Sequence, residues 1–209
     1  MIRGVSTARL EETSPDPVHV DQRITLYDAT WEDYERLLEL RGESSNPRLT
    51  YLEGVLELMS PSLPHEDQKK TLARLVEAWS EELGIPLEGI GSWTLKKREA
   101  EPGAEPDECY RRGEGRRNEF PDFVIEVIWT HGGLDKRHVY FRLWIREVWY
   151  WKRGTLTFHV RRGSRYVRSD RSEVVPELDP ELIARCMAEP TQLAAVRAIR
   201  AAAKEQKGE

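Results

Sequence analysis

The sequence has little that would mark a secreted, disulfide-stabilised or membrane protein. Only two cysteines, Cys109 and Cys186, occur among 209 residues, so neither a disulfide framework nor a CxxC metal-binding pair is present. The mean hydropathy is −0.65, and no apolar run approaches the length of a bilayer span. Residues 1–20 lack the apolar stretch of a signal peptide and are expected to form a loose tail. These absences favour a cytoplasmic protein that does not bind a membrane.

The chain also lacks an internal repeat and any recognisable helix-turn-helix or zinc finger. Its charge is uneven. Residues 1–57 contain 6 basic and 12 acidic side chains, whereas residues 90–171 contain 18 basic and 12 acidic. A polyanion partner would explain the basic region. A solvated surface of mixed charge explains it as well, and charge clusters alone favour that interpretation. The sequence pI of about 5.7 does not favour nucleic-acid binding.

Helical and strand periodicities alternate along the chain. Thr30 is a suitable N-cap for a first helix, and Glu53-Gly54 is a suitable turn for a hairpin. Hydrophobic periodicity and turn-forming residues predict helices at 30–40, 65–83, 134–145, 180–187 and 191–204. The same signals predict strands at 49–52, 55–59, 87–90, 93–97, 106–110, 119–129, 147–152, 156–160 and 166–167. This pattern indicates an α/β fold: a flexible tail, residues 1–22, followed by a single domain, residues 23–205.

The strand expected at residues 119–129 has two acids among apolar residues. Alternate residues of a strand share a face, so Asp122 and Glu126 point the same way. A carboxylate at Glu126 is costly to bury unless a cation compensates for it. A structural ion pair with Arg142 or Lys136 would do so, and so would a bound metal. Asp122 lies about 13 Å from Glu126 along an extended strand, so it is expected to start the strand or to bind an arginine.

A metal site is the more informative alternative, because a second acid lies at a suitable spacing. Asp107 and Glu126 are 19 residues apart, which suits two adjacent strands joined by a loop. Two carboxylates at matched heights could share one Mg²⁺, which binds oxygen ligands and keeps several waters. Lys136 follows the strand and could stabilise developing negative charge. Asp107 could instead be an ordinary turn residue after Pro106, and Glu66 could simply favour a helix N-terminus.

Several short motifs occur in a fixed order, and together they resemble one family. They are Met59-Ser60-Pro61-Ser62 with His65-Glu66, Glu105-Pro106-Asp107-Glu108-Cys109-Tyr110, Pro121-Asp122-Phe123-Val124-Ile125-Glu126-Val127, Asp135-Lys136 with Tyr140, and Glu147-Val148-Trp149-Tyr150-Trp151. This order is similar to that of the Uma-two family, a bacterial family expanded in cyanobacteria. The resemblance extends from about Tyr27 to Ala198. It implies the PD-(D/E)XK superfamily and a restriction-endonuclease-like fold, with a mixed central sheet flanked by helices.

The resemblance also implies roles for individual residues. Asp107 matches the acid of the PD motif, Glu126 the acid of the (D/E)XK half, and Glu66 the helix-borne acid that completes the metal site. Asp107, Glu126 and Lys136 are therefore the expected catalytic residues, and Glu66, Asp107 and Glu126 the expected metal ligands. The superfamily's lysine two residues after the acid is replaced here by Ile128, and Lys136 matches the lysine that the family places in the next helix. The family's usual serine after this strand is replaced near Trp129-Thr130.

The expected activity is Mg²⁺-dependent hydrolysis of DNA phosphodiester bonds by a homodimer. One alternative is a catalytically inactive nuclease fold that binds nucleic acid or protein. Another is a structural homo-oligomer without a nucleic-acid role. Any sequence specificity would have to come from loops such as residues 111–118. His65 is expected to start a helix or line the site, Cys109 to be buried, and Trp144, Trp149 and Trp151 to lie in the core or at a dimer surface.

Overall fold

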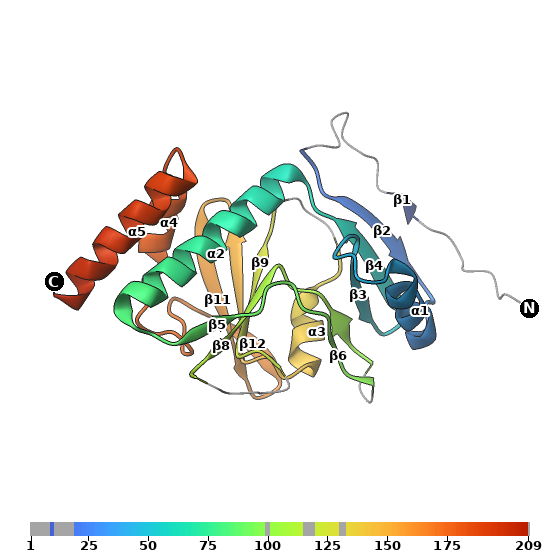
Figure 1. Cartoon of the computed structure of the whole chain (residues 1–209). Helices are drawn as coiled ribbons and strands as arrows, with labels where there is room; N and C mark the ends of the chain where they lie inside the picture. The colour runs from blue at the N-terminus through green and yellow to red at the C-terminus, as the bar shows by residue number, and fades with distance from the viewer. Residues whose placement is uncertain (1–8, 11–18, 99–100, 115–119, 130–132, 209) are drawn as a thin grey trace, which may run out of the picture. The chain divides into compact units, whose positions relative to one another are not determined.

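A computed structural model of the chain describes residues 9–10, 19–98, 101–114, 120–129 and 133–208 (Figure 1). Most of the expected tail and residues 115–118 of the 111–118 loop lie outside these ranges, as does Thr130. By its internal contacts the chain divides into two compact units. The first unit is Met1–His65, Thr94–Glu105 and Trp129–Trp144, and the second is Glu66–Trp93, Pro106–Ile128 and Ile145–Glu209. That residues 23–205 fold as a single domain stays a prediction.

The first unit is built on an antiparallel sheet with strand order β1-β2-β4-β3-β7-β6. Its helix α1 packs Trp31 and Tyr34 against Tyr51, and the rings of Tyr34 and Tyr51 stack with centroids 5.7 Å apart. The elements of this unit are β1 (Arg9–Leu10), β2 (Gln22–Leu26), α1 (Trp31–Arg41), β3 (Arg48–Leu52), β4 (Val55–Ser60), β6 (Leu95–Lys96), β7 (Gly103–Ala104) and α3 (Lys136–Arg142).

Two local sequence signals in this unit act as predicted. Thr30 caps α1 in a capping box, in which the Asp33 amide donates to Thr30 Oγ1 and the Thr30 amide donates to Asp33 Oδ2. Glu53 and Gly54 both have positive φ, 49° and 84°, in the turn between β3 and β4. This geometry fits a tight hairpin, and the residues after Gly54 therefore pair back onto β3.

The second unit is built on a mixed sheet with strand order β12-β11-β10-β9-β8-β5. Only β9 and β10 are parallel among the neighbouring strands described, which confirms the α/β class with a mixed sheet. The elements are α2 (Leu63–Leu83, in this unit from Glu66 onward), β5 (Leu87–Gly89), β8 (Glu108–Arg112), β9 (Phe123–Val127), β10 (Glu147–Lys152), β11 (Thr155–Arg162), β12 (Arg165–Ser169), α4 (Pro180–Met187) and α5 (Gln192–Lys207).

One face of this sheet is covered by α2, α4 and α5 (Figure 1). Phe123 stacks on Tyr110 and on Trp149, with ring centroids 5.1 and 4.2 Å apart. Trp149 and Trp151 are buried, as expected for core residues, whereas Trp144 of the first unit is exposed. Since Phe123, Ile125 and Val127 point to the helices, Val124 and Glu126 point to the opposite face.

Some boundaries differ from those predicted. The helix expected at residues 134–145 is shorter, because α3 is capped by Asp135 and ends at Arg142. The strand expected at 106–110 begins at Glu108, so Asp107 immediately precedes it. The strands β1, β2 and β7 are additional to those predicted, and β1 lies within the expected tail. Within the described ranges, no helix is both long and apolar enough to cross a membrane.

Candidate active site

Asp107 and Glu126 lie across from each other on neighbouring strands. In the antiparallel pairing of β8 with β9, Glu108 is opposite Ile125, and continuing this register by one residue places Asp107 opposite Glu126. Residues paired in this way have Cβ atoms about 5 Å apart. Their exposed fractions are 0% and 3%. The Val127 amide donates to Asp107 Oδ2 over 2.6 Å, which fixes this carboxylate at the level of Glu126.

Two buried carboxylates at this separation repel each other. A divalent cation between them would remove that repulsion. The donors are hard oxygen atoms, which suit Mg²⁺, and Mg²⁺ commonly takes one or two protein carboxylates and completes its shell with water. The pair therefore fits such an ion. In the described part of the chain, no group of three His, Cys, Asp or Glu side chains that could hold a metal is found.

Glu66 and Asp122 have other identified partners. Glu66 lies in the first turn of α2, where its carboxylate is 2.5 Å from Lys69 Nζ and its side chain is 39% exposed. Asp122 accepts from the Arg112 amide over 2.9 Å and pairs with Arg146 at 3.3 Å. Asp122 thus anchors the start of β9, as its place in the sequence suggested. The role of Glu66 as a metal ligand stays a prediction.

Lys136 is the first residue of α3 in the first unit. Its Nζ donates to the Glu105 carbonyl oxygen over 3.4 Å, and Glu105 precedes Asp107 by two residues in the chain. The Glu105 carboxylate is itself fixed by Arg41 at 2.5 and 2.7 Å, by the Leu49 amide at 2.8 Å and by Thr94 Oγ1 at 2.6 Å. Lys136 therefore contacts the backbone of a residue whose side chain is held by several hydrogen bonds.

A second buried acid holds the segment that leads to Lys136. Glu57 of β4 accepts from the Leu134 amide over 3.0 Å. Gly133 has φ +92°, and a Cβ at this position would lie 2.5 Å from Glu57 Oε2. Only glycine suits both conditions. Sequence reasoning did not single out Glu57, although it lies within an apolar strand, the same signal that marked Glu126. Glu105 was noticed only as part of a motif.

His65 takes part in a buried network at the start of α2. Asp21 Oδ1 accepts from the Ser62 amide over 2.9 Å, and Asp21 Oδ2 lies 3.1 Å from His65 Nδ1. Burial acts to raise the pKa of Asp21, but hydrogen bonds from His65 and Ser62 and the charges of His65 and Arg23 hold that pKa well below its usual range. The expectation that His65 lies at a helix start is confirmed.

Cys109 is an inert buried thiol. Its Sγ donates to the Gly91 carbonyl at 3.2 Å, and burial raises the pKa of the thiol to about 12. A thiol with so high a pKa is almost entirely protonated at neutral pH. The expectation that Cys109 is a small buried residue is confirmed.

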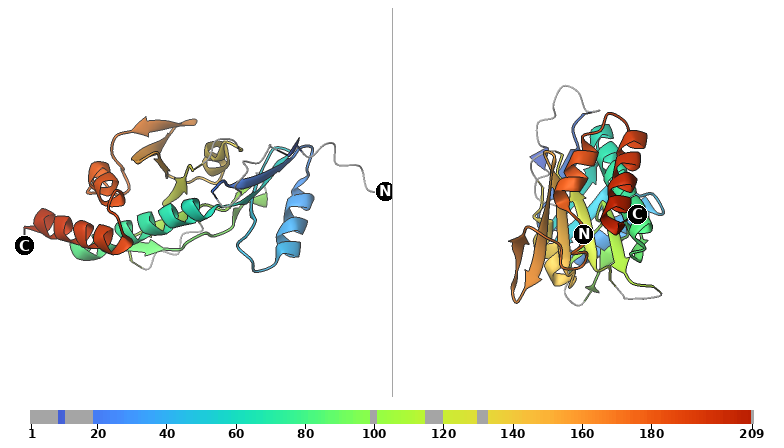
Figure 2. Two further views of the ribbon diagram at one scale, coloured as in Figure 1. Left: turned by 90° about the horizontal axis from the view of Figure 1, so that it is seen from above. Right: turned by 90° about the vertical axis from the view of Figure 1, so that its left-hand side faces the viewer.

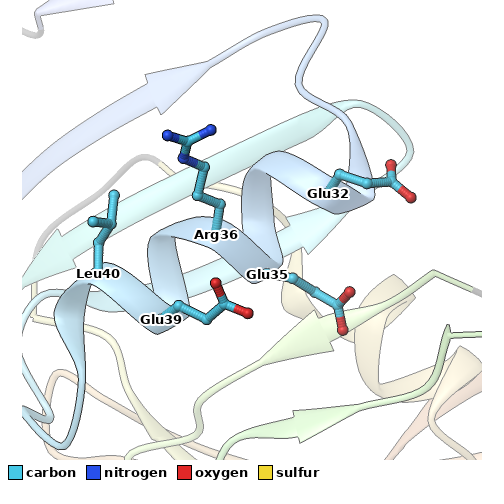
Figure 3. Close-up of a pocket in the computed structure, with 5 residues that line it drawn as sticks. All are labelled: Glu32, Glu35, Arg36, Glu39 and Leu40. Atoms are coloured by element: carbon cyan, nitrogen blue, oxygen red, sulfur yellow. The ribbon is translucent and has the colours of Figure 1, made fainter.

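A surface depression lies on α1 of the first unit. It has a volume of about 540 Å³ and is lined by Glu32, Glu35, Arg36, Glu39 and Leu40 (Figure 3). These residues follow helical spacing on a solvated face. Glu35 pairs with Lys96 and Arg98, and Glu32 pairs with Arg98. The depression therefore has the features of an ordinary charged helix surface.

The sequence matches the model of a known protein family. Residues 31–192 match the Uma2 family, which is described as "Putative restriction endonuclease". The chain belongs to the Uma2 family. This agrees with the resemblance found from the motifs and supports an assignment to nucleases.

Among solved structures, the chain is similar to one titled a "putative nuclease belonging to DUF820" from Anabaena variabilis. The two share 11% sequence identity, the match covers 82% of this chain and 99% of the other, and the TM-score is 0.44. No curated protein matches the sequence.

Proposed function

We propose that this Uma2 protein is a divalent-metal-dependent endonuclease that hydrolyses DNA. The single observation that carries the proposal is the buried carboxylate pair, Asp107 opposite Glu126 on adjacent strands. A buried pair of acids in this arrangement costs stability unless a cation compensates for it. Membership of a family described as restriction endonucleases supports the assignment to nucleases.

In this proposal Asp107 and Glu126 hold Mg²⁺, and Glu66 contributes a further oxygen. When bound, Mg²⁺ would activate water and neutralise charge on the leaving oxygen of a phosphodiester. The protein's own contribution is to keep the two carboxylates at one level, which the Val127 amide does for Asp107. Lys136, fixed on the Glu105 carbonyl, would supply a positive charge to the phosphate.

A second candidate function is a nuclease fold that binds nucleic acid or protein without cleaving it. The specific observation in its favour is Ile128, which stands two residues after Glu126 where the superfamily has lysine. Its amide donates to the Trp151 carbonyl over 2.8 Å, and its side chain cannot supply positive charge. Metal dependence separates the two functions, because a binding module would retain its affinity in chelator.

The test is titration calorimetry of Mg²⁺ and Mn²⁺ into wild-type protein and Glu126→Gln, with plasmid cleavage measured on the same samples. Glu108→Gln is a matched control, because it removes the same charge one residue from Asp107. We expect Glu126→Gln to lose metal binding and to lower cleavage by at least about 100-fold, while Glu108→Gln retains both. Wild-type protein that binds neither metal would refute the endonuclease and favour the binding module.

We further propose that the protein is a homodimer. The exposed side chains of Trp144 and Leu40, 66% and 74% accessible, are large apolar groups of the kind that interfaces bury. Light scattering coupled to size-exclusion chromatography gives the mass directly. A mass near 24 kDa at all concentrations would contradict a dimer.

A further inference from the structure

The excess positive charge of this protein is concentrated in one segment of the second unit. Residues 146–171 contain eight basic and two acidic side chains, whereas residues 90–145 contain ten of each. The segment corresponds to β10, β11 and β12. The whole chain has a net charge of −5, so the positive charge of this segment is opposite in sign to that of the protein. Such a local excess suggests a role for the segment itself.

The register of the sheet shows which side chains share a face with Glu126. Glu126 pairs with Tyr150, and Tyr150 pairs with Thr157. Alternate residues of β11 share this face, and His159 of β11 pairs with Arg168 of β12, which extends the face to β12. These residues define the basic face. We use this name for six residues that point away from α2, α4 and α5: Tyr150, Lys152, His159, Arg161, Tyr166 and Arg168.

Burial along β11 confirms this division. Leu156, Phe158 and Val160 are buried on the helix side, while Thr157, His159 and Arg161 are only half-buried on the other. On this side of the sheet, exposure increases toward the edge, from buried Val124 on β9 and Val148 on β10 to exposed Arg168 on β12. The hairpin of β11 and β12, orange in Figure 2, forms that edge. The face is therefore accessible at its β12 end.

Two cations of this face, Lys152 and Arg168, differ from other cations nearby in their partners. Arg162 pairs with Glu173, and Arg146 pairs with Asp122. Within the described ranges, neither Lys152 nor Arg168 forms an ion pair, and both are exposed. Tyr150 and His159 lie between them, with their rings edge-to-face at 5.2 Å. Cations interleaved with aromatic rings are typical of surfaces that bind the phosphates and bases of nucleic acids.

We propose that the basic face binds the phosphate backbone of a polynucleotide and leads it from the β12 edge to Asp107 and Glu126. The proposal rests on the proposed function for the nature of the ligand. Neighbouring strands are about 4.8 Å apart, so β10, β11 and β12 lie about 5, 10 and 15 Å from β9. Successive charges along one DNA strand advance by about 3.4 Å along the helix axis. The basic face would thus contact phosphates from about one to five nucleotides away from the bond that is cut.

The test is the salt dependence of DNA binding by the full chain in chelator, where no cleavage can occur. Fluorescence anisotropy of a labelled duplex of about 20 base pairs gives the affinity at each salt concentration. The variant is the double substitution Lys152→Gln and Arg168→Gln. Each lost phosphate contact lowers the slope of log K against log salt by about 0.9, so we expect a decrease of about 1.8 and an affinity loss of about 10-fold or more.

A matched control removes two exposed arginines from the helices that cover the opposite face, Arg185→Gln on α4 with Arg197→Gln on α5. We expect this control to keep the wild-type slope and affinity. Equal weakening by both double variants would overturn the proposal, because net charge alone would then explain the binding. Binding of wild-type protein to anionic vesicles but not to DNA would also overturn it.

Plasmid cleavage in Mg²⁺ separates this inference from the proposed function. Wild-type protein that binds DNA through the basic face but never cleaves it would refute the endonuclease and support this surface. Cleavage by wild-type protein with unchanged DNA affinity in the Lys152→Gln and Arg168→Gln variant would refute the surface alone. Circular dichroism of each variant checks that it is folded.

Discussion

Two buried glutamates on neighbouring strands of the same sheet point to opposite faces of that sheet. Glu147 of β10 accepts four hydrogen bonds, from Trp149 Nε1 at 2.9 Å, Ser172 Oγ at 2.6 Å, and the amides of Glu173 and Val174 at 2.5 and 2.8 Å. Glu126 of β9 points to the other face and lies opposite a second carboxylate, Asp107. Burial alone therefore does not mark a functional acid. The neighbouring groups do, because donors stabilise a buried carboxylate whereas a second acid destabilises it.

The sharpest test of this comparison is the stability of two equivalent variants. Glu147→Gln leaves an amide facing donors that need an acceptor, and we expect it to lower the free energy of unfolding by about 3 kcal/mol or more. Glu126→Gln removes repulsion with Asp107, so its effect should stay within about 1 kcal/mol. Urea denaturation in chelator measures both. If Glu126→Gln cost as much as Glu147→Gln, Glu126 would be a structural acid like its neighbour.

Asp21 extends the comparison, because it is another buried acid stabilised by donors. Its folded pKa is depressed, so its contribution is complete above its unfolded pKa, about 4, and is lost as pH falls toward the lower folded pKa. We expect Asp21→Asn to cost on the order of 2 kcal/mol at pH 7. The difference from wild type should shrink below about pH 4.

Urea denaturation at a series of pH values measures this difference. Asp28→Asn is the control, because Asp28 is exposed and its backbone, with φ 58°, is one that asparagine adopts readily. A difference between Asp21→Asn and wild type that did not change with pH would show that Asp21 acts through shape rather than through charge.

These networks explain which parts of the molecule could be predicted from the sequence. The capping box of α1, the turn at Glu53-Gly54 and the strand β10 depend on neighbouring residues, and each lies where local patterns placed it. The spacing of Asp107 and Glu126 predicted two adjacent strands, and β8 and β9 are indeed neighbours in the sheet. The strand β2 was missed, since it is short and pairs with residues of β4 that lie 30 to 38 positions later in the sequence.

The supporting groups of the candidate site could not be predicted in the same way. Arg41 meets Glu105 across 64 residues of sequence, and Leu134 meets Glu57 across 77. No local period encodes such pairs, because they form only when separate elements of the fold come together. The one available signal was a charged residue within an apolar strand. That signal marks Glu57 and Glu126 equally, and it does not reveal which groups contact either of them.

Gly133 offers the smallest of the expected effects and tests whether Glu57 holds the segment before Lys136. Gly133→Ala introduces a Cβ at positive φ and also forces it against the Glu57 carboxylate. Gly154→Ala is the matched control, since Gly154 has φ +76° with no atom within 4 Å of the added Cβ. We expect the control to cost about 1 kcal/mol from the backbone alone, and Gly133→Ala to cost about 1 kcal/mol more.

The same pair of variants reports on Lys136 through cleavage. If Glu57 positions the start of α3, Gly133→Ala should lower the cleavage rate at saturating DNA, because Lys136 follows Gly133 by only three residues. Gly154→Ala should leave that rate unchanged. Equal stability losses with equal cleavage in the two variants would mean that Glu57 is a structural acid without influence on the site. Glu57 would then be a structural acid like Glu147, and it would differ in role from the site acids Asp107 and Glu126.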